Sequence, residues 1–306
     1  MRILCLLRFA IIVAVSIFPL YANGAGDIAV IRSQDLDPYN QAFAGFSESC
    51  ASNVKQYTLG GNGASQQRMA QEIGAEKPRL VLAIGLMAAK LAKEYLKDIP
   101  TLYIMVSNPK KYGLIGNNIA GITLNIPVEA QFKTYKTLVP GLKSIGVIYD
   151  ANNSGEIIRE ASAVAKKLGV QLVAVSVTSQ KEVPEALRSM LGKVDAVWMV
   201  PDETVVTTDS FKYFLVTTLE KGVPFFAASD IFVEAGALAA LTPDYTDVGR
   251  QGCQLAIGFT DGQVSLAETG ARPPRKINLS LNLKTARKIG LAIPKSVIES
   301  AKLVYQ

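Results

Sequence analysis

Short apolar runs alternate with amphipathic segments along most of this chain, from residue 27 onward. Runs of about six residues, such as RLVLAI at residues 79–84, are typical of strands that are buried on both faces of a parallel sheet. The segments between these runs repeat apolar residues at helical spacing. One of them carries a single apolar stripe, formed by Ile157, Ile158, Ala161, Val164, Ala165 and Leu168. The alternation predicts βαβ units, and therefore an α/β protein with parallel sheets.

The pattern occurs twice. The first series predicts strands at residues 27–32, 54–59, 79–84, 101–106 and 119–123. After Pro140 and Gly141 it restarts, with strands at residues 144–149, 170–175, 195–200 and 224–228. We therefore expect two Rossmann-like lobes, since the length also suggests about two domains. The first lobe would comprise residues 26–140 and about 237–272, and the second residues 141–236 and about 273–306.

The ends of the strands indicate where a ligand would bind. In open α/β sheets, ligands bind outside the carboxyl ends of the strands. Two such lobes facing one another would place these ends around a single interlobe cleft.

Residues 1–25 have the pattern of a secretory signal peptide. Arg2 and Arg8 give a positive start, residues 9–20 are apolar and uncharged, and small residues follow at positions 22–25. The apolar run is short for a membrane span of about 20 residues, although an uncleaved anchor is the alternative reading. Cys5 precedes the apolar run, unlike a lipoprotein cysteine. These features predict export, and we expect a periplasmic location.

Charge and cysteines add little to this picture. The net charge is +6, but the basic residues form no long run, which argues against nucleic-acid binding and favours solvated surface lysines. Cys50 and Cys253 remain after the leader. Cys50 continues the apolar face of its predicted helix, so we expect a small buried hydrophobe in preference to a disulfide.

Several kinds of chemistry are missing. The chain has no histidine, which removes the commonest general base and the usual zinc ligand. Gly60, Gly61 and Gly63 begin like a dinucleotide fingerprint, but Gln66 occupies the third glycine position, so a flexible turn is the better interpretation. We expect no catalytic residues, no metal and no cofactor. A binding role needs only a cleft with polar strand ends.

The order and spacing of several segments resemble the extracytoplasmic substrate-binding proteins of ABC transporters, in the group with tryptophan-binding-like members. The matching segments include KPRLVLAIG at residues 77–85, VSNP at 106–109, SIGVIY at 144–149, VPDETVV at 200–206, GVPFFA at 222–227, EAGALA at 234–239, DYTDVGRQ at 244–251 and NLKTARKIGL at 282–291. The resemblance implies a type I periplasmic-binding fold, with two lobes joined by three crossovers and a hinge that closes on the ligand.

The strand ends then supply candidate ligand-binding residues. In the first lobe they are Gln34, Tyr39, Gly85, Leu86, Met87, Ser107 and Asn108. In the second they are Tyr149, Asp150, Asp202, Glu203, Thr204, Ser229 and Asp230. Asp244 and Tyr245 follow, where the chain returns to the first lobe.

Each chemical group of an amino acid has candidate partners among these residues. Asp202, Asp230 or Asp244 would hold the ammonium group, and the N–H groups of residues 85–88 would hold the carboxylate. Tyr39, Tyr149 or Tyr245 would stack on an aromatic or apolar side chain. The alternative is a purely structural role, in which the aspartates cap helices and the tyrosines are partly buried core residues.

Leu86 and Asn108 depart from the family pattern. A small hydroxyl residue is common at the first position and an aspartate at the second. The sequence therefore predicts the fold and the binding role more firmly than the solute.

The sequence is compatible with three functions. The favoured one is a solute-binding protein that delivers a small molecule to an ABC permease, with an aromatic or other apolar amino acid as the candidate solute. The alternatives are a periplasmic ligand sensor that docks on a membrane receptor and an exported α/β enzyme that uses carboxylates. A monomer is expected, because hinge closure needs no second subunit.

Overall fold

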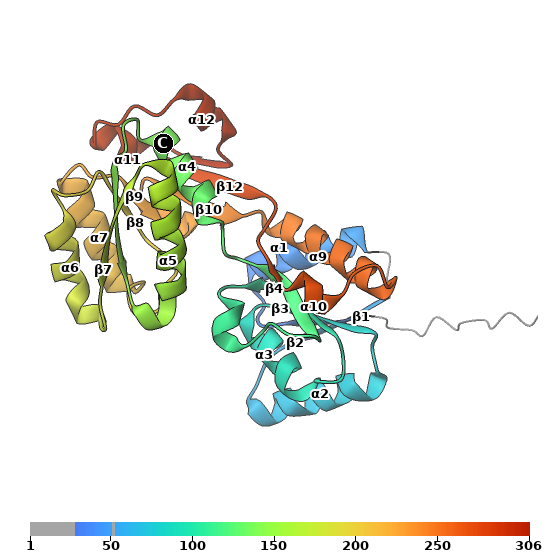
Figure 1. Ribbon diagram of the computed structural model, residues 1–306. Helices are drawn as coiled ribbons and strands as arrows, with labels where there is room; N and C mark the ends of the chain where they lie inside the picture. The colour runs from blue at the N-terminus through green and yellow to red at the C-terminus, as the bar shows by residue number, and fades with distance from the viewer. Residues whose placement is uncertain (1–27, 51–52) are drawn as a thin grey trace, which may run out of the picture.

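The computed structural model describes residues 28–50 and 53–306. They form two α/β lobes that lie side by side (Figure 1). The leader expected at residues 1–25, and Cys5 within it, lie outside the described residues. Among the described residues, no helix has both the length and the apolar character needed to cross a membrane.

The first lobe is built on a six-stranded sheet in the order β11-β5-β4-β3-β1-β2, with every neighbouring pair parallel. Its strands are β1 (Ile28–Arg32), β2 (Val54–Thr58), β3 (Leu80–Ile84), β4 (Thr101–Val106), β5 (Ile119–Thr123) and β11 (Ala271–Arg272). Its helices are α1 (Asp37–Ser49), α2 (Gly63–Glu76), α3 (Leu86–Tyr95), the 3-10 turn η1 (Pro109–Tyr112), α9 (Tyr245–Thr260) and α10 (Leu266–Thr269).

The second lobe is built on a seven-stranded sheet in the order β13-β12-β10-β9-β8-β6-β7, parallel except for the β10–β12 pair. Its strands are β6 (Ser144–Tyr149), β7 (Gln171–Ser176), β8 (Ala196–Trp198), β9 (Phe225–Ala227), β10 (Ala239–Pro243), β12 (Ile277–Asn282) and β13 (Leu303–Tyr305). Its helices are α4 (Val128–Leu138), α5 (Ala151–Leu168), η2 (Gln180–Glu182), α6 (Val183–Met190), α7 (Thr208–Glu220), α8 (Asp230–Glu234), α11 (Leu283–Lys288) and α12 (Lys295–Ser300).

Each sheet is covered on both faces, as the continuous apolar runs predicted. In β3, Leu80, Leu82 and Ile84 pack into the cluster that contains α1 and α9 residues. The alternate residues Val81 and Ala83 pack into the cluster beneath α2 and α3. Because successive side chains of a strand point to opposite faces, a strand between two helical layers must be apolar at every position.

Helices α1 and α9 pack with their backbones almost in contact. A Cβ atom on Gly45 would lie 2.0 Å from the Thr246 carbonyl oxygen, and one on Gly249 would lie 1.9 Å from the Ala42 carbonyl oxygen. No real side chain tolerates such distances, so both positions require glycine. This close packing fixes how the N-terminal ends of the two helices are presented to the rest of the molecule.

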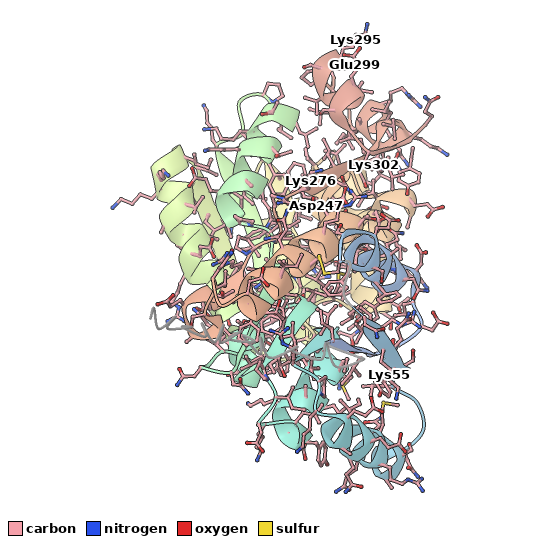
Figure 2. All side chains as sticks on the ribbon, turned by 90° about the vertical axis from the view of Figure 1, so that its right-hand side faces the viewer. Lys55, Asp247, Lys276, Lys295, Glu299 and Lys302 are labelled. Carbon is pink, nitrogen blue, oxygen red and sulfur yellow. A yellow bond between two sulfur atoms is a disulfide. The ribbon has the colours of Figure 1, made fainter. Side chains whose placement is uncertain are left out.

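The expectation that Cys50 is an unpaired buried residue was wrong. Cys50 at the end of α1 and Cys253 in α9 form a disulfide, with Cα atoms 5.6 Å apart (Figure 2). Both residues are buried, at 6% and 1% exposed, so the helical pattern did place Cys50 on the core face. That face is covered by α9, and this tertiary contact brings the second cysteine to it.

Two of the three lobe boundaries lie at different residues from those expected. Helix α4 packs its Phe132 and Tyr135 into the core of the second sheet, and β10 is a strand of that sheet. The chain therefore crosses between lobes at residues 124–127, at Asp244 and at residues 273–276, and not near residues 140 and 237. The turn at Pro140 and Gly141 separates α4 from β6 within one lobe, so it did not mark a boundary.

Candidate functional site: the interlobe cleft

The three crossovers form the base of the cleft between the lobes. The second and third run together, because the Asp244 N–H donates to the Lys276 carbonyl at 3.0 Å and so continues the β10–β12 pairing. The first is held to the second lobe by Gln131, whose amide donates to the Ile126 carbonyl at 2.9 Å. The Gln131 side-chain oxygen in turn accepts bonds from Trp198 and Tyr135.

The third crossover is held to the first lobe by a buried carboxylate. The Arg275 guanidinium donates to both oxygens of Asp247, at 2.9 and 3.2 Å. The Lys276 ammonium group lies 3.6 Å from the same carboxylate. Asp247 and Lys276 are labelled in Figure 2. The Asp247 side chain is only 3% exposed. Burial by itself would raise its pKa, but the bonds and positive charges of Arg275 and Lys276 outweigh burial and hold the pKa below its usual value.

A cavity of about 290 Å³ lies against the first and second crossovers. Its wall includes Trp198 and Met199 at the end of β8, Ala227 and Ala228 after β9, and Tyr245 at the start of α9. Most of the remaining lining is apolar, with Ser107, Asn125 and Thr242 among the polar exceptions. An apolar concavity with a few polar groups is the usual form of a small-molecule site.

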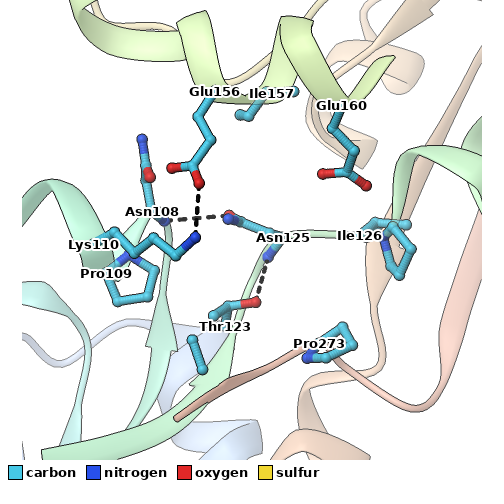
Figure 3. A pocket seen from close by; sticks show the side chains of 12 residues that line it. Asn108, Pro109, Lys110, Thr123, Asn125, Ile126, Glu156, Ile157, Glu160 and Pro273 are labelled. Atoms are coloured by element: carbon cyan, nitrogen blue, oxygen red, sulfur yellow. Dashed lines mark hydrogen bonds and ion pairs between the residues drawn. The ribbon is translucent and has the colours of Figure 1, made fainter. Parts of the chain in front are cut away.

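A second cavity of about 300 Å³ adjoins the first and shares Asn125, Ile126, Ile157 and Glu160 with it. Figure 3 shows Glu156 pointing from α5 towards Lys110, while Glu160 points into the open space. Asn125 accepts a bond from the Asn108 N–H at 3.3 Å, and its own N–H donates to Thr123 at 3.2 Å.

The wall of the first lobe includes the start of α3. Gly85 has φ of +90°, and a Cβ there would lie 2.7 Å from Ser33 Oγ and 2.8 Å from the Tyr39 hydroxyl. Ser33 Oγ accepts the Ala88 N–H at 2.9 Å. The Leu86 and Met87 N–H groups form no hydrogen bond among the described residues. A helix N-terminus with unpaired N–H groups attracts an anion.

The backbone is strained where β4 reaches the cleft. Met105 has φ of +62° although it is not glycine, and the pairing of β4 with β5 shifts between Ile104 and Val106. Asn108 also has a left-handed backbone, with φ of +49°. Such strain persists only where surrounding structure enforces it, and it often occurs at functional sites. Here the irregularity lies immediately before Ser107 and Asn108, which line the two cavities.

Tyr39 and Tyr245 lie in the first turns of the two helices that pack at Gly45 and Gly249. Burial raises the pKa of both phenols. The negative charge of Asp230, in the second lobe, raises the pKa of Tyr245 further. The Asp230 carboxylate accepts a bond only from the N–H of Ile231 within the described residues.

The other predicted aspartates are already used within the fold. One oxygen of Asp202 accepts the Asp150 N–H, and the other accepts the N–H groups of Thr204 and Val205. Asp150 caps α5 and accepts the Thr204 hydroxyl at 2.8 Å. These bonds lower the pKa of Asp150, most strongly the backbone bond from Asn152. Asp244 caps α9 through the Asp247 N–H at 2.9 Å.

Two predicted site residues, Asn108 and Glu203, take part in direct contacts between the lobes. We call these contacts the interlobe latch. It joins Asn108, Lys110, Lys111 and Tyr112 of the first lobe to Asn153, Glu156 and Glu203 of the second. Lys110 and Glu156 are 2.7 Å apart, and Lys111 lies 2.8 Å from the Asn153 side chain. The latch was not predicted, because no local pattern pairs charges from different lobes.

The two cavities therefore include only part of the predicted set. Ser107 and Tyr245 line one and Asn108 lines the other. Among the predicted residues, Gln34, Met87 and Glu203 are exposed. The apolar cavity is also lined by residues that were not predicted from the sequence, namely Asn125, Ile126, Thr242 and Trp198. Three of these belong to the crossovers or the adjoining strand end, and the misplaced boundaries hid them. Trp198 is the single tryptophan of the chain, and this alone could have marked it as a candidate site residue.

A pair of α/β lobes joined by three crossovers around one cleft defines a two-lobed solute-binding protein. The family described as ABC transporter substrate binding protein matches residues 44–305, and the chain belongs to it. This is a family of substrate-binding proteins and not an enzyme family.

Individual relatives agree with this assignment. A tyrosine-binding protein from Clostridioides difficile (strain R20291) is 29% identical over 205 residues, which is 64% of this chain and 59% of that protein. The match thus spans less than two thirds of that relative.

Solved structures show the same fold. An ABC domain in complex with L-Trp from Streptococcus pneumonia is 24% identical, with a TM-score of 0.65, over 91% of this chain and 99% of that chain. The ligand-free, open structure of a substrate binding protein with adhesive properties from Clostridium difficile is 21% identical, with a TM-score of 0.74 and the same coverages. A periplasmic ribose ABC transporter from Conexibacter woesei is 13% identical, with a TM-score of 0.58, over 88% and 96% of the two chains. They support the type I periplasmic-binding fold.

Proposed function

We propose that this protein captures an aromatic amino acid, of the tyrosine or tryptophan class, in the interlobe cleft outside the cytoplasm and delivers it to an ABC permease. The observation that carries the proposal is Asp230, which accepts no bond from another element in the described part of the chain and whose charge raises the pKa of Tyr245 in the first lobe. A carboxylate with spare acceptor capacity suits an ammonium group. Asp202, by contrast, has bonds to both oxygens.

The remaining parts of an aromatic amino acid also find matching groups. The free N–H groups at the start of α3 suit its carboxylate. The apolar cavity at the crossovers, with Trp198 and Tyr245 in its wall, suits its ring. The names of the tyrosine-binding relative and of the L-Trp complex support the same class of solute.

Delivery to a permease completes the proposal. It includes export through the N-terminal leader to the periplasm, action as a monomer, hinge closure on the solute and no nucleic-acid partner. Closure follows if the solute binds the closed form better than the open one. The family supports an extracytoplasmic place of action.

Isothermal titration calorimetry with L-tyrosine, L-tryptophan and L-phenylalanine tests the proposal, with leucine and ribose as comparison solutes. We expect one aromatic amino acid to bind, and Asp230→Asn to weaken its binding about 10- to 100-fold, the usual effect of losing a charged hydrogen bond. Asp209→Asn is the matched control, because Asp209 is an exposed aspartate in the first turn of α7. Binding of ribose and no amino acid would show that the proposed solute class is wrong.

A further inference from the structure

The net positive charge of the protein is concentrated at its C-terminal end. Residues 272–306 contain eight Lys and Arg residues and one acidic residue, Glu299, whereas the whole chain has a net charge of only +6. The rest of the chain is therefore close to neutral. This segment folds mainly as β12, α11, α12 and β13 of the second lobe.

Part of this charge joins other cations where the strands of the second sheet begin. A shallow concavity there is lined by residues 139–142 before β6, Asp195 before β8, Gly222 before β9 and residues 289–291 after α11. The residues that flank these segments are basic and exposed: Lys143, Lys193, Lys221, Arg287 and Lys288. We call these five residues the distal basic surface, because strand starts lie at the opposite edge of the sheet from the cleft. Figure 1 shows α11 on the side of the second lobe that is away from the first lobe.

The charges of this surface are not neutralised nearby. None of the five side chains forms an ion pair among the described residues. The nearby acids are Asp195 and Glu220. Asp195 already accepts the N–H groups of Lys143 and Ser144 and the Ser144 hydroxyl, while Glu220 is exposed at the end of α7. The five cations of the distal basic surface therefore outnumber the nearby carboxylates, Asp195 and Glu220, and the surface has a net positive charge.

We propose that the distal basic surface binds the anionic headgroups of a phospholipid bilayer. Four of its five residues are lysines, which act as mobile, hydrated point charges and suit a fluid layer of phosphates. Its concavity has no aromatic lining that would stack on bases or anchor a protein partner. The surface is separate from the cleft, so a membrane-bound molecule keeps its solute site free. Such binding would confine the protein to the membrane that holds its permease.

Vesicle co-sedimentation tests this inference with protein purified from the exported fraction. The vesicles are phosphatidylcholine mixed with phosphatidylglycerol, or phosphatidylcholine alone. We expect binding only to the anionic vesicles and its loss at high salt, since the Debye length falls to about 3 Å at 1 M salt. The double variant Lys221→Glu with Arg287→Glu should weaken binding at least about tenfold, because each cation near the surface contributes about fivefold.

Arg68→Glu with Lys97→Glu is the matched control. Both residues are exposed on the first lobe, and the pair changes the net charge by the same amount with the same residue types. Glutamate at position 287, near the C-terminal end of α11, interacts unfavourably with the helix dipole and could unfold the Glu double variant. If that variant does not fold, Lys221→Gln with Arg287→Gln replaces it in the vesicle experiment. Tyrosine and tryptophan titrations on all variants check the cleft independently of the vesicles.

An equal loss of binding in the test and control pairs would overturn the inference, because net charge alone would then explain it. So would binding to neutral vesicles, no binding to anionic ones at low salt, or binding to a DNA or acidic-peptide probe without vesicle binding.

Discussion

At the scale of single residues, the aspartates near the cleft differ in their roles, and the hydrogen bonds that each accepts indicate its role. Asp150, Asp202 and Asp247 accept bonds from other elements of the fold, whereas Asp230 accepts none from another element within residues 28–50 and 53–306. An aspartate with both oxygens engaged stabilises the protein, and one with spare capacity can bind a ligand. Sequence position alone does not separate the two cases.

Asp247 should contribute stability that depends on pH. Its pKa in the folded protein lies below the unfolded value of about 3.9, so the contribution is present above that pH and declines as the pH falls towards the folded pKa. We expect Asp247→Asn to lower the free energy of unfolding by about 1–3 kcal/mol at pH 7. Urea denaturation of the wild type and the variant at pH 7 and pH 3 measures this difference in the free energy of unfolding. A difference from the wild type that does not shrink at pH 3 would contradict this assignment.

At the scale of elements, the pairing of α1 with α9 connects two parts of the chain that are far apart in sequence. Cys50 and Cys253 are separated by 203 residues, and the glycines Gly45 and Gly249 let the helices touch. The same two helices present Tyr39 and Tyr245. The disulfide thus stabilises the pair of elements that positions one side of the cleft.

Removing the disulfide should destabilise the protein without changing its fold. We expect Cys50→Ala with Cys253→Ala to lower the free energy of unfolding by about 2–4 kcal/mol, because the crosslink restricts the unfolded chain. Denaturant titration measures the change. Reduction of the wild type should give a similar loss, and reduction of the double variant should give none. A wild type that is equally stable with and without reductant would show that the bridge does not form in solution.

At the scale of the whole molecule, the polar contacts of the interlobe latch hold the lobes together on one edge of the cleft. Lys110 and Glu156 are both more than half exposed, so their pair contributes at most about 1 kcal/mol. Such weak contacts permit hinge motion while biasing it. The crossovers, anchored by Gln131 in one lobe and Asp247 in the other, leave only a short segment of chain to bend.

Breaking the latch should weaken solute binding. We expect Glu156→Lys to lower the affinity for the solute roughly two- to fivefold, because the new lysine repels Lys110. The charge-swapped double variant, Glu156→Lys with Lys110→Glu, should recover most of this affinity. Calorimetry at low and high salt measures both effects, which salt should reduce. A charge-swapped double variant that is no better than Glu156→Lys would contradict direct pairing. Stability measured in the absence of solute is the control.

Most strands of both sheets were predictable, because apolar runs between helical layers follow from the backbone period and burial. Strands β10, β11 and β13 were not predicted as strands. Runs such as residues 79–84 and 144–149 were predicted within a residue of the observed strands. The candidate site was less predictable. Strand ends indicated Ser107 and Tyr245, but the crossover residues Asn125 and Thr242 have no local pattern that marks them.

The sequence by itself determined the α/β class, the two repeated series and the resemblance to a binding-protein family, since these depend on local periodicity and ordered motifs. Only the tertiary structure decided the crossovers, the Cys50–Cys253 bridge, the distal basic surface and which aspartates accept bonds from other elements. Each of these depends on contacts between residues far apart in the chain. Local sequence records which residues are buried or charged, but the packing of lobes and helices decides what they meet.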